Sequence, residues 1–491
     1  MTTTTDTGLP APAPHIAILG GGPGGYEAAL VALRLGAQVT IIERQGMGGA
    51  AVLTDVVPSK TLIATAEWMT LGGAAAELGI RINEDSDDYA DTQSISVDLR
   101  AVNERVRALA LAQSEDIHAR LIALGATIMT GNGRMISPTT IEVSERTDHT
   151  GASLPDNEVT ADFVLLAVGA TPRVLPTVQP DNRRILTWTQ LYHLDELPTK
   201  LIVVGSGVTG AEFAGAYHAL GAEVVLVSSR DRVLPGEDAD AANLIEKVFT
   251  ARGMTVMGRS RAQAAEVKTK DGEEYVEVTL ADGRTVTGSH VLMAVGSIPN
   301  TAGIGLEEIG VKLTASGHIE TDKVSRTTAP NVYAAGDCTG IFPLASVAAM
   351  QGRVAMSHAL GDSVRPIKLR SVAANIFTAP EIATVGYSQV ALEEQRPEDF
   401  EVTMLSLRRN PRAKMMGMRE GFVKLFSTKE DGVVLGGVVV APRASELIYP
   451  ITMAVTHRLT VDDVADAFTV YPSLTGTIAE VARMGHQRIN D

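Results

Sequence analysis

The stretch HIAILGGGPGGYEAALVALRLGAQVTIIER, residues 15–44, decides the fold of this chain. A short apolar run, Ile16–Leu19, leads into three glycines with the spacing G-x-G-x-x-G: Gly20, Gly22 and Gly25. A helical apolar pattern follows, and a second apolar run, Val39–Ile42, ends at Glu43. This order predicts a strand, a tight turn, a helix and a second strand.

Such a unit is suited to bind a dinucleotide. Its glycines let the turn close and bring backbone N–H groups near a pyrophosphate, which lies at the positive end of the helix. An acid at the end of the second strand, here Glu43, accepts hydrogen bonds from ribose hydroxyls. The glycines alone are a weak signal, but strand, helix and terminal acid together favour a nucleotide site over a turn without ligand.

The same pattern returns in KLIVVGSGVTGAEFAGAYHALGAEVVLVSSRDRVLP, residues 200–235. Its glycines are Gly205, Gly207 and Gly210. In the first copy the acid stands 23 positions after the first glycine, from 20 to 43, and the same count from 205 reaches Ser228. The second site therefore lacks the carboxylate.

The missing carboxylate bears on which nucleotide the second site accepts. A carboxylate about 4 Å from a 2′-phosphate costs roughly 4 kcal/mol per unit charge at an effective dielectric constant of about 20. Ser228 removes that repulsion and Arg230 stands two positions further on, so we expect NADPH to be accepted. Arg230 could instead be a solvated loop residue, and Ser228 can hydrogen-bond a plain ribose, so NADH use stays open.

Bulk composition narrows the class of protein. At about 150 residues per domain, 491 residues predict about three domains. The formal charge of −16 argues against nucleic acid or an anionic membrane as partner, because both require a basic face. The single cysteine, Cys338, excludes an intrachain disulfide and a cysteine-rich metal site, so no metal is expected. Such sparing use of cysteine agrees with a location in the reducing cytoplasm. No apolar run is long enough to span a membrane, and residues 1–14 have the composition of a disordered tail.

Two dinucleotide units in one chain suggest electron transfer between two cofactors. Further segments agree, among them NVYAAGDCTGIFPLASVAAMQGRVA, residues 331–355, and RAKMMGMREGFVKLF, residues 412–426. On these segments, the chain from about His15 to the C-terminus resembles the pyridine nucleotide–disulfide oxidoreductases, the family of dihydrolipoamide dehydrogenase and glutathione reductase.

The resemblance implies an α/β fold with two Rossmann-like dinucleotide-binding domains, for FAD and NAD(P), and a C-terminal α+β dimerisation domain. The FAD-binding domain is expected in two parts, 15–170 and 291–365. The NAD(P)-binding domain is expected at 171–290 and the dimerisation domain at 366–491. A homodimer or a higher homo-oligomer is therefore expected.

The resemblance also implies the candidate catalytic residues Lys60, Glu212 and Tyr471. Lys60 would lie beside the reactive flavin nitrogen and pair with Glu212, although the two could instead be separate surface charges. The cofactor-binding residues that it implies are Gly20, Gly22, Gly25, Glu43, Lys60, Gly169, Gly205, Gly207, Gly210, Ser228, Arg230, Gly296, Gly336 and Asp337, with Asp337 on the ribityl chain of FAD.

The chain departs from the family where disulfide chemistry takes place. In GMGGAAVLTDVVPSK, residues 46–60, the positions of the two redox cysteines hold Ala51 and Val56. Near the C-terminus, Tyr471 and Gly476 stand in place of the proton-carrying histidine and its orienting glutamate. A phenol with a reference pKa of about 10 is a poor proton carrier at neutral pH. Because thiol–disulfide exchange needs a thiol pair, reduction of lipoamide or glutathione by the family mechanism is excluded.

Three functions remain. We expect an FAD-dependent NAD(P)H dehydrogenase that passes electrons through the flavin directly to a small-molecule, quinone-type acceptor. Tyr471 would form a wall of the acceptor site in the partner subunit, and Val208 either opens the flavin face or simply packs in its turn. Cys338 is expected to be packed and inert. The alternative is a soluble transhydrogenase, which Val208 and the pair Tyr471 and Pro472 also resemble, and the third is a non-enzymatic flavin redox sensor.

Overall fold

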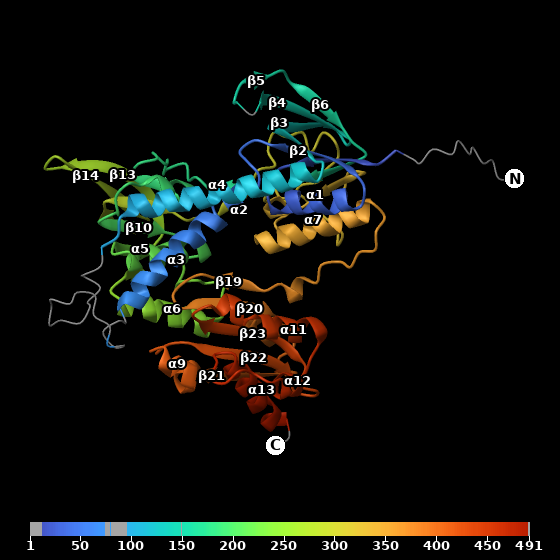
Figure 1. Cartoon of the computed structure of the whole chain (residues 1–491). Coiled ribbons are helices and arrows are strands. Elements are labelled where there is room, and N and C mark those ends of the chain that lie inside the picture. Colours follow the sequence, from blue (N-terminus) through green and yellow to red (C-terminus); the bar gives the residue numbers. More distant parts are fainter. Residues whose placement is uncertain (1–11, 74–78, 80–95, 149, 490–491) are drawn as a thin grey trace. The chain divides into compact units, whose positions relative to one another are not determined.

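The computed structural model describes residues 12–73, 79, 96–148 and 150–489. Residues 1–11 of the expected N-terminal tail lie outside the described residues. The chain divides into two compact units, which are described separately (Figure 1). Unit 1 comprises Met1–Val57, Ala108–Thr171 and Ser297–Ile367, and unit 2 comprises Pro58–Arg107, Pro172–Gly296 and Lys368–Asp491.

The main sheet of unit 1 is built around the first glycine turn. Its strand order is β18-β7-β1-β2-β3-β4-β5, with β6 paired to β4. The strand β1 (His15–Leu19) lies between β2 (Gln38–Glu43) and β7 (Phe163–Leu166), and all three are parallel. Because their interior residues are buried, these strands are apolar along their length. The other strands of unit 1 are β3 (Thr127–Ser137), β4 (Thr140–Thr147), β5 (Ser153–Leu154), β6 (Asn157–Thr160), β18 (Val332–Ala334), and the pair β8 (Ala170–Pro172) and β17 (Ser297–Pro299).

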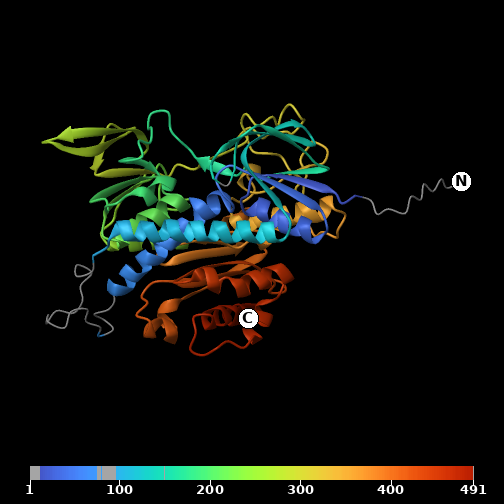
Figure 2. The ribbon, with the colours of Figure 1, turned by 45° about the horizontal axis from the view of Figure 1, so that its top comes forward.

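Two helices of unit 1, α1 (Pro23–Arg34) and α7 (Ala345–Ala359), lie side by side (Figures 1 and 2). Their backbones approach so closely at Gly352 that a Cβ on this residue would lie only 2.1 Å from the carbonyl oxygen of Gly24. The approach is fixed further by Arg353 of α7, whose Nε donates to Glu27 of α1 at 2.8 Å. Unit 1 also contains α2 (Gly49–Leu53), η4 (Asp337–Thr339) and residues 108–123 of α4 (Leu99–Ala123).

Unit 2 contains a second parallel sheet around the second glycine turn, in the order β12-β11-β10-β16-β9. Its central strand β10 (Lys200–Val204) lies between β11 (Glu223–Val227) and β16 (His290–Met293). The remaining strands and the associated helices are β9 (Ile185–Thr187), β12 (Thr255–Met257), α3 (Val56–Gly73), η3 (Trp188–His193), α5 (Val208–Ala219) and α6 (Ala239–Ala251).

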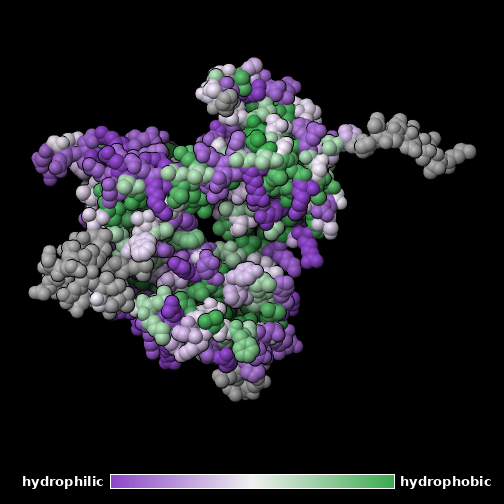
Figure 3. Space-filling model, in the orientation of Figure 1, coloured by the Kyte–Doolittle hydropathy of each residue, from purple (hydrophilic) through white to green (hydrophobic). Residues whose placement is uncertain are grey.

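A three-stranded antiparallel sheet packs beside this one and consists of β13 (Ala262–Lys270), β14 (Glu273–Leu280) and β15 (Thr285–Gly288). Its buried residues, including Val276 and Val278, join the core of the parallel sheet. In Figure 3 the surface over β13 and β14 is hydrophilic, in agreement with the charged residues along both strands.

The C-terminal part of unit 2 is an antiparallel sheet covered by helices. Its order is β19-β20-β23-β22-β21. Lys424 in this sheet is 1 % exposed and its ammonium lies 2.8 Å from the Asp238 carboxylate, which caps α6. Pairing makes burial of this charge tolerable. The elements are β19 (Ala374–Ile376), β20 (Glu381–Gly386), β21 (Phe400–Ser406), β22 (Phe422–Thr428), β23 (Val434–Ala441), α8 (Gln389–Gln395), α9 (Pro411–Met415), α10 (Ala444–Leu447), α11 (Tyr449–His457), α12 (Val461–Asp466) and α13 (Gly476–Ile489), with the short turns η5 (Leu369–Ser371) and η6 (Leu407–Arg409).

The predicted fold class is confirmed. Both glycine segments form parallel strand–helix–strand units, and the C-terminal region combines an antiparallel sheet with helices. Across the described ranges, no helix combines the length and the apolar character that crossing a membrane requires.

Candidate functional site

The first glycine turn leaves an open space before α1. Gly20 has a φ of +103°, and a Cβ there would lie 2.3 Å from the carbonyl oxygen of Ala167. A Cβ on Gly25 would lie 2.0 Å from the carbonyl oxygen of Gly20, so neither position accepts a larger residue. Gly22, by contrast, faces open space and caps α1 without a side-chain hydrogen bond. The first N–H groups of this 12-residue helix can therefore take an anion such as a pyrophosphate.

Glu43 closes this turn from the end of β2. Its Oε2 accepts a hydrogen bond from the Gly21 N–H at 2.6 Å, and its Oε1 accepts one from the Gln45 N–H at 2.7 Å. A Cβ at Gly21 would lie 2.9 Å from the sulfur of Met47, so a larger residue there would require the Met47 side chain to shift. Oε1 also accepts a hydrogen bond from the Gly46 N–H at 3.4 Å, so Oε2 is the oxygen that keeps a further acceptor position, which suits a ribose hydroxyl.

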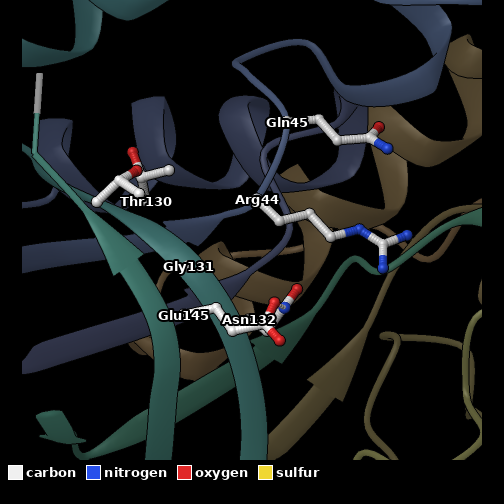
Figure 4. Close-up of a pocket in the computed structure, with 7 residues that line it drawn as sticks. Arg44, Gln45, Thr130, Gly131, Asn132 and Glu145 are labelled. Carbon is white, nitrogen blue, oxygen red and sulfur yellow. Dashed lines mark hydrogen bonds between the residues drawn. The ribbon is translucent and has the colours of Figure 1, made fainter. Parts of the chain in front are cut away.

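A polar hollow of about 460 Å³ lies beside the end of β2 (Figure 4). Arg44 extends from the strand end, while Asn132 of β3 donates a hydrogen bond to Glu145 of β4. The lining residues are Arg44, Gln45, Thr130, Gly131, Asn132, Glu145 and Thr147. A second hollow of about 330 Å³ includes Glu43 itself. The sequence did not point to β3 and β4, because only sheet pairing brings them to Glu43; their polar groups could hold the adenosine half of a dinucleotide.

The turn at Gly336 and Asp337 is organised by a residue that the sequence did not single out. Gln351 of α7 is 2 % exposed, and its Oε1 accepts a hydrogen bond from the Gly336 N–H at 2.7 Å. Burial raises the pKa of Asp337, and the charge of His318 partly opposes this. Within the described part of the chain, no group donates a hydrogen bond to the Asp337 carboxylate. A half-buried carboxylate that lacks a donor fits a sugar-alcohol hydroxyl such as those of the ribityl chain.

Cys338 follows directly and is fully buried. Its thiol lies 3.3 Å from the carbonyl oxygen of Ala335, and burial raises the pKa of the thiol to about 12. A thiol that stays protonated and inaccessible is chemically inert at neutral pH.

The second glycine turn repeats the first in backbone geometry. Gly205 has a φ of +111°, and a Cβ there would lie 2.1 Å from the carbonyl oxygen of Ala294. A Cβ on Gly210 would lie 1.8 Å from the carbonyl oxygen of Gly205, whereas one on Gly207 would meet nothing within 4 Å. The start of α5 is therefore also open to an anion.

The end of β11 differs from the end of β2. Ser228 is fully buried, and its hydroxyl lies 2.7 Å from the hydroxyl of Ser206. The same oxygen accepts a hydrogen bond from the Arg230 N–H at 3.1 Å. Ser228 thus holds its own loop together, while Arg230 is exposed. The sequence pattern could not show this, because Ser206 lies 22 residues away.

The structure brings Lys60 and Glu212 together within unit 2. The Lys60 ammonium lies 2.8 Å from Oε2 of Glu212, and the side chains are 28 % and 4 % exposed. Glu212 Oε1 accepts a hydrogen bond from the Phe377 N–H at 2.9 Å, and the ammonium lies 4.9 Å from the centre of the Phe377 ring. Phe377, which the sequence did not indicate, thus orients both charges.

The remaining sequence candidates lie at chain turns and exposed positions. Gly169 and Gly296 have φ values of +66° and +94°, which larger residues adopt only under strain. Val208 is 41 % exposed at the start of α5. Tyr471 is 82 % exposed and precedes α13, which begins at Gly476. Ala51 lies in α2, and Val56 begins α3.

Fold and site together define a class of flavin-linked oxidoreductase, and comparison with known sequences agrees. Residues 14–352 match the family described as pyridine nucleotide-disulphide oxidoreductase, and residues 372–482 match the dimerisation domain of that family. The chain therefore belongs to the pyridine nucleotide-disulphide oxidoreductases, as predicted. Members of this family use FAD and NAD(P)H.

The chain is similar over nearly its whole length to individual proteins. A protein of Mycobacterium tuberculosis named NAD(P)H dehydrogenase (quinone) is 52 % identical over 481 residues, which is 97 % of this chain and 95 % of that protein. A dihydrolipoyl dehydrogenase of Chlamydia muridarum is 32 % identical over 467 residues, 95 % of each chain. The crystal structure of LpdA from Mycobacterium tuberculosis has a TM-score of 0.87 at 50 % identity, covering 96 % of this chain and 99 % of LpdA. These similarities confirm that the chain is an enzyme.

Proposed function

We propose that this chain is an FAD-dependent NAD(P)H dehydrogenase that passes electrons to a quinone-type acceptor without an internal disulfide. One observation carries the proposal: the Lys60–Glu212 pair is present, while both redox cysteine positions are occupied by Ala51 and Val56. The machinery for accepting hydride is thus retained, and the machinery for thiol exchange is lost. The name of the relative that is 52 % identical, NAD(P)H dehydrogenase (quinone), supports this choice of acceptor.

The chain supplies binding groups for FAD at the first glycine turn, at Glu43 and at Asp337. Bound FAD would supply a ring that accepts hydride from a nicotinamide and gives up electrons to a second molecule. By the family resemblance, Lys60 stands beside that ring. Its ammonium stabilises negative charge there, because Glu212, whose other oxygen accepts from the Phe377 N–H, holds the ammonium in place before the reaction begins.

The fate of the electrons follows from the missing thiols. Cys338 cannot relay them, because burial raises its pKa to about 12 and no second cysteine exists in the chain. A planar acceptor that takes electrons directly from the ring needs neither a thiolate nor a histidine base. We extend the proposal to a homodimer, since the chain carries the dimerisation domain, and to Tyr471 as a wall of the acceptor site in the partner subunit.

The experiment is anaerobic stopped-flow spectroscopy on the purified holoenzyme. NADPH should bleach the flavin absorbance, and a soluble benzoquinone added in a second mixing step should restore it within one turnover. NAD+ should restore it far more slowly. Faster reoxidation by NAD+ than by the quinone would make the protein a transhydrogenase, and absence of bleaching with both NADPH and NADH would overturn the proposal altogether.

A thiol reagent provides an independent check. Iodoacetamide at pH 8 should not label Cys338 in the folded protein and should not inhibit quinone reduction, because a thiol with a pKa of about 12 contains almost no thiolate at that pH. Labelling should appear after unfolding in guanidinium chloride. Inhibition of the folded enzyme that follows the extent of labelling would contradict a disulfide-free route.

A further inference from the structure

The segment that contains the end of β21 and all of α9 is strongly basic. Residues 402–419 include five basic residues and no acidic one: Arg408, Arg409, Arg412, Lys414 and Arg419. All five are exposed. In a chain with a net charge of −16, this run is a local reversal of sign. Such a reversal favours an anionic ligand.

Asn410 joins this basic segment to the loop that carries Tyr471. Its Nδ2 donates to the Ser473 carbonyl oxygen and to the Thr477 hydroxyl, both at 2.8 Å. Its Oδ1 accepts a hydrogen bond from the N–H of Ala413, a fully buried residue, at 3.1 Å. Tyr471 precedes Ser473 by two residues, so its Cα lies within about 7 Å of the residue that Asn410 holds.

The loop itself, residues 467–475, is uncharged and largely apolar, with the sequence AFTVYPSLT. Phe468 is fully exposed, and Val470 and Tyr471 are 79 % and 82 % exposed. Exposed apolar side chains of this size suit the face of a planar ring. An acceptor ring can therefore lie against the loop while a negative substituent on that ring meets the basic segment.

The acidic side chains of neighbouring elements do not cancel the positive charge. Glu420 is shared between Arg408 at 3.0 Å and Lys247 of α6 at 3.7 Å. Three acids on α12 and α13 have partners there: Asp462 with His486, Asp463 with Thr460, and Glu480 with Arg483. Asp466 borders the loop. Five basic residues against Glu420 and Asp466 leave a formal sum of +3.

Resting on the proposed transfer of electrons to a quinone-type acceptor, we propose that Arg409 and Arg412 select quinones with an anionic substituent, such as a sulfonate, by binding that group beside the ring at Tyr471. The two arginines flank Asn410, which fixes their backbone. Within the described part of the chain, neither guanidinium has an ionic or hydrogen-bonding partner. Each can therefore donate two N–H groups to the anion. Because the arginines and Tyr471 belong to one chain, they reach the acceptor together whichever subunit holds the flavin.

The choice of acceptor leaves the reaction itself unchanged. NAD(P)H gives up a hydride, and the quinone takes up its two electrons and its proton. Solvent supplies a second proton, so the products are NAD(P)+ and the hydroquinone. The sulfonate stays charged throughout and takes no part in electron transfer. The arginines therefore act on binding of the acceptor and not on flavin reduction.

The test compares 1,4-naphthoquinone-2-sulfonate with 1,4-naphthoquinone. The holoenzyme is reduced anaerobically with one equivalent of NADPH, and stopped-flow mixing with each quinone gives the second-order rate constant of flavin reoxidation. In the double variant Arg409→Ala with Arg412→Ala, this constant should fall by about tenfold for the sulfonate and change by less than about twofold for the neutral quinone. Each variant is compared with the parent protein for the same quinone, so the two reduction potentials do not enter.

Two further measurements separate charge from shape. The variant Arg409→Lys with Arg412→Lys keeps both charges and should recover most of the rate with the sulfonate. The difference between the alanine variant and the parent should shrink at high salt, because the screening length falls to about 3 Å at 1 M. A lysine variant as slow as the alanine variant, or a difference that salt does not change, would overturn the role of charge.

A matched control removes two positive charges from the opposite end of the same strands. Arg396 precedes β21 and lies 3.6 Å from Asp399, and the Lys429 N–H after β22 donates to the Asp399 carbonyl oxygen at 3.0 Å. Because β21 has seven residues, this end lies about 20 Å from Arg408. Arg396→Ala with Lys429→Ala should leave both rate constants within about twofold. A tenfold loss with the sulfonate would reduce the effect to net charge and overturn the proposal.

The outcomes separate this inference from the proposed function. If neither quinone reoxidises the reduced flavin of the parent protein, the proposed function fails. If both do and the double alanine variant slows neither, or slows both equally, only the selection of anionic quinones fails. Light scattering reports the mass of each variant. A selective loss at the mass of the parent supports the proposal, whereas a loss that accompanies dissociation would assign the arginines to a contact between copies and overturn it.

Discussion

The two glycine turns share one backbone plan and differ in the side chains placed around it. Gly20 and Gly205 have φ values of +103° and +111°, and each turn is closed by a later glycine whose Cβ would overlap the carbonyl oxygen of the first. Around the first turn, Glu43 reaches the Gly21 N–H with its carboxylate. Around the second turn, Ser206 and Ser228 stand at the positions of Gly21 and Glu43, and their hydroxyls form a hydrogen bond with each other. The same backbone geometry thus carries a carboxylate at the first turn and a pair of neutral hydroxyls at the second, at the strand end where we propose that the ribose binds.

The helices α1 and α5, which follow the two turns, also share their geometry and differ in the role of a side chain. Glu27 and Glu212 both stand seven positions after the first glycine of their turns. Glu27 is 20 % exposed and pairs with Arg353 of a neighbouring helix, which is a packing role. Glu212 is 4 % exposed and pairs with Lys60. Equivalent positions in duplicated units therefore took on different tasks, one structural and one that we assign to the redox site.

The largest effects are expected where the two turns are the same. Gly25→Ala and Gly210→Ala would each place a methyl group within 2.0 Å of a carbonyl oxygen. Overpacking of this kind costs about 1–3 kcal/mol or more, so we expect loss of FAD from the first variant and loss of NADP+ binding by over about a hundredfold in the second. Released flavin fluorescence and calorimetry measure the two effects.

The matched controls are Gly22→Ala and Gly207→Ala, whose Cβ atoms would meet nothing within 4 Å. These variants should keep the melting temperature of the parent protein but weaken ligand binding, because the methyl group occupies the space open to a pyrophosphate. If Gly210→Ala behaves like Gly207→Ala in both measurements, the close contact does not decide the turn.

The variants Glu212→Gln and Glu27→Gln test whether the equivalent glutamates of the two helices have different roles, one in the redox site and one in packing. Glu212→Gln leaves the partly buried Lys60 ammonium without its counter-charge, so we expect flavin reduction by NADPH to slow by about tenfold to a hundredfold. Glu27→Gln removes a more exposed ion pair and should cost about 0–1 kcal/mol of stability with little change in that rate. Stopped-flow reduction and thermal unfolding provide the readouts. Equal slowing in both variants would show that Glu212 acts only through stability.

The double variant Ser206→Gly with Ser228→Glu transfers the Gly21 and Glu43 arrangement to the second turn. The new carboxylate should repel a 2′-phosphate and lower the preference for NADP+ over NAD+ by about a hundredfold, less in high salt. The ratio of the two dissociation constants at low and high ionic strength measures this. An unchanged ratio would mean that the phosphate does not lie at this strand end.

The smallest effect is expected from Ser228→Ala. The Ser228 hydroxyl is fully buried against Ser206, so its loss should lower the free energy of unfolding by about 1 kcal/mol and change neither nucleotide affinity by more than about threefold. Chemical denaturation and calorimetry measure the two quantities. A large loss of NAD+ affinity would instead show that Ser228 contacts the ribose directly.

Much of the fold could be predicted because its signals are local. The glycine spacing, the apolar runs that flank it and the acid at position 43 lie within 30 residues of each other, and each has a direct steric or electrostatic reason. The candidate site was harder to predict from the sequence. Gln351 and Phe377 are an ordinary amide and an ordinary aromatic in the sequence, and only long-range packing brings them to Gly336 and Glu212.

By itself, the sequence determined that two dinucleotide turns are present, that the chain cannot form an internal disulfide, and that Ser228 stands where Glu43 stands in the first turn. These properties depend on which atoms a position contains. Tertiary structure alone decided that the Ser228 hydroxyl is hydrogen-bonded to Ser206, that Gln351 accepts a hydrogen bond from the Gly336 N–H, and that Phe377 lies beside Lys60 and Glu212. These properties depend on burial and on contacts between distant segments, and the spacing of residues along a chain specifies neither.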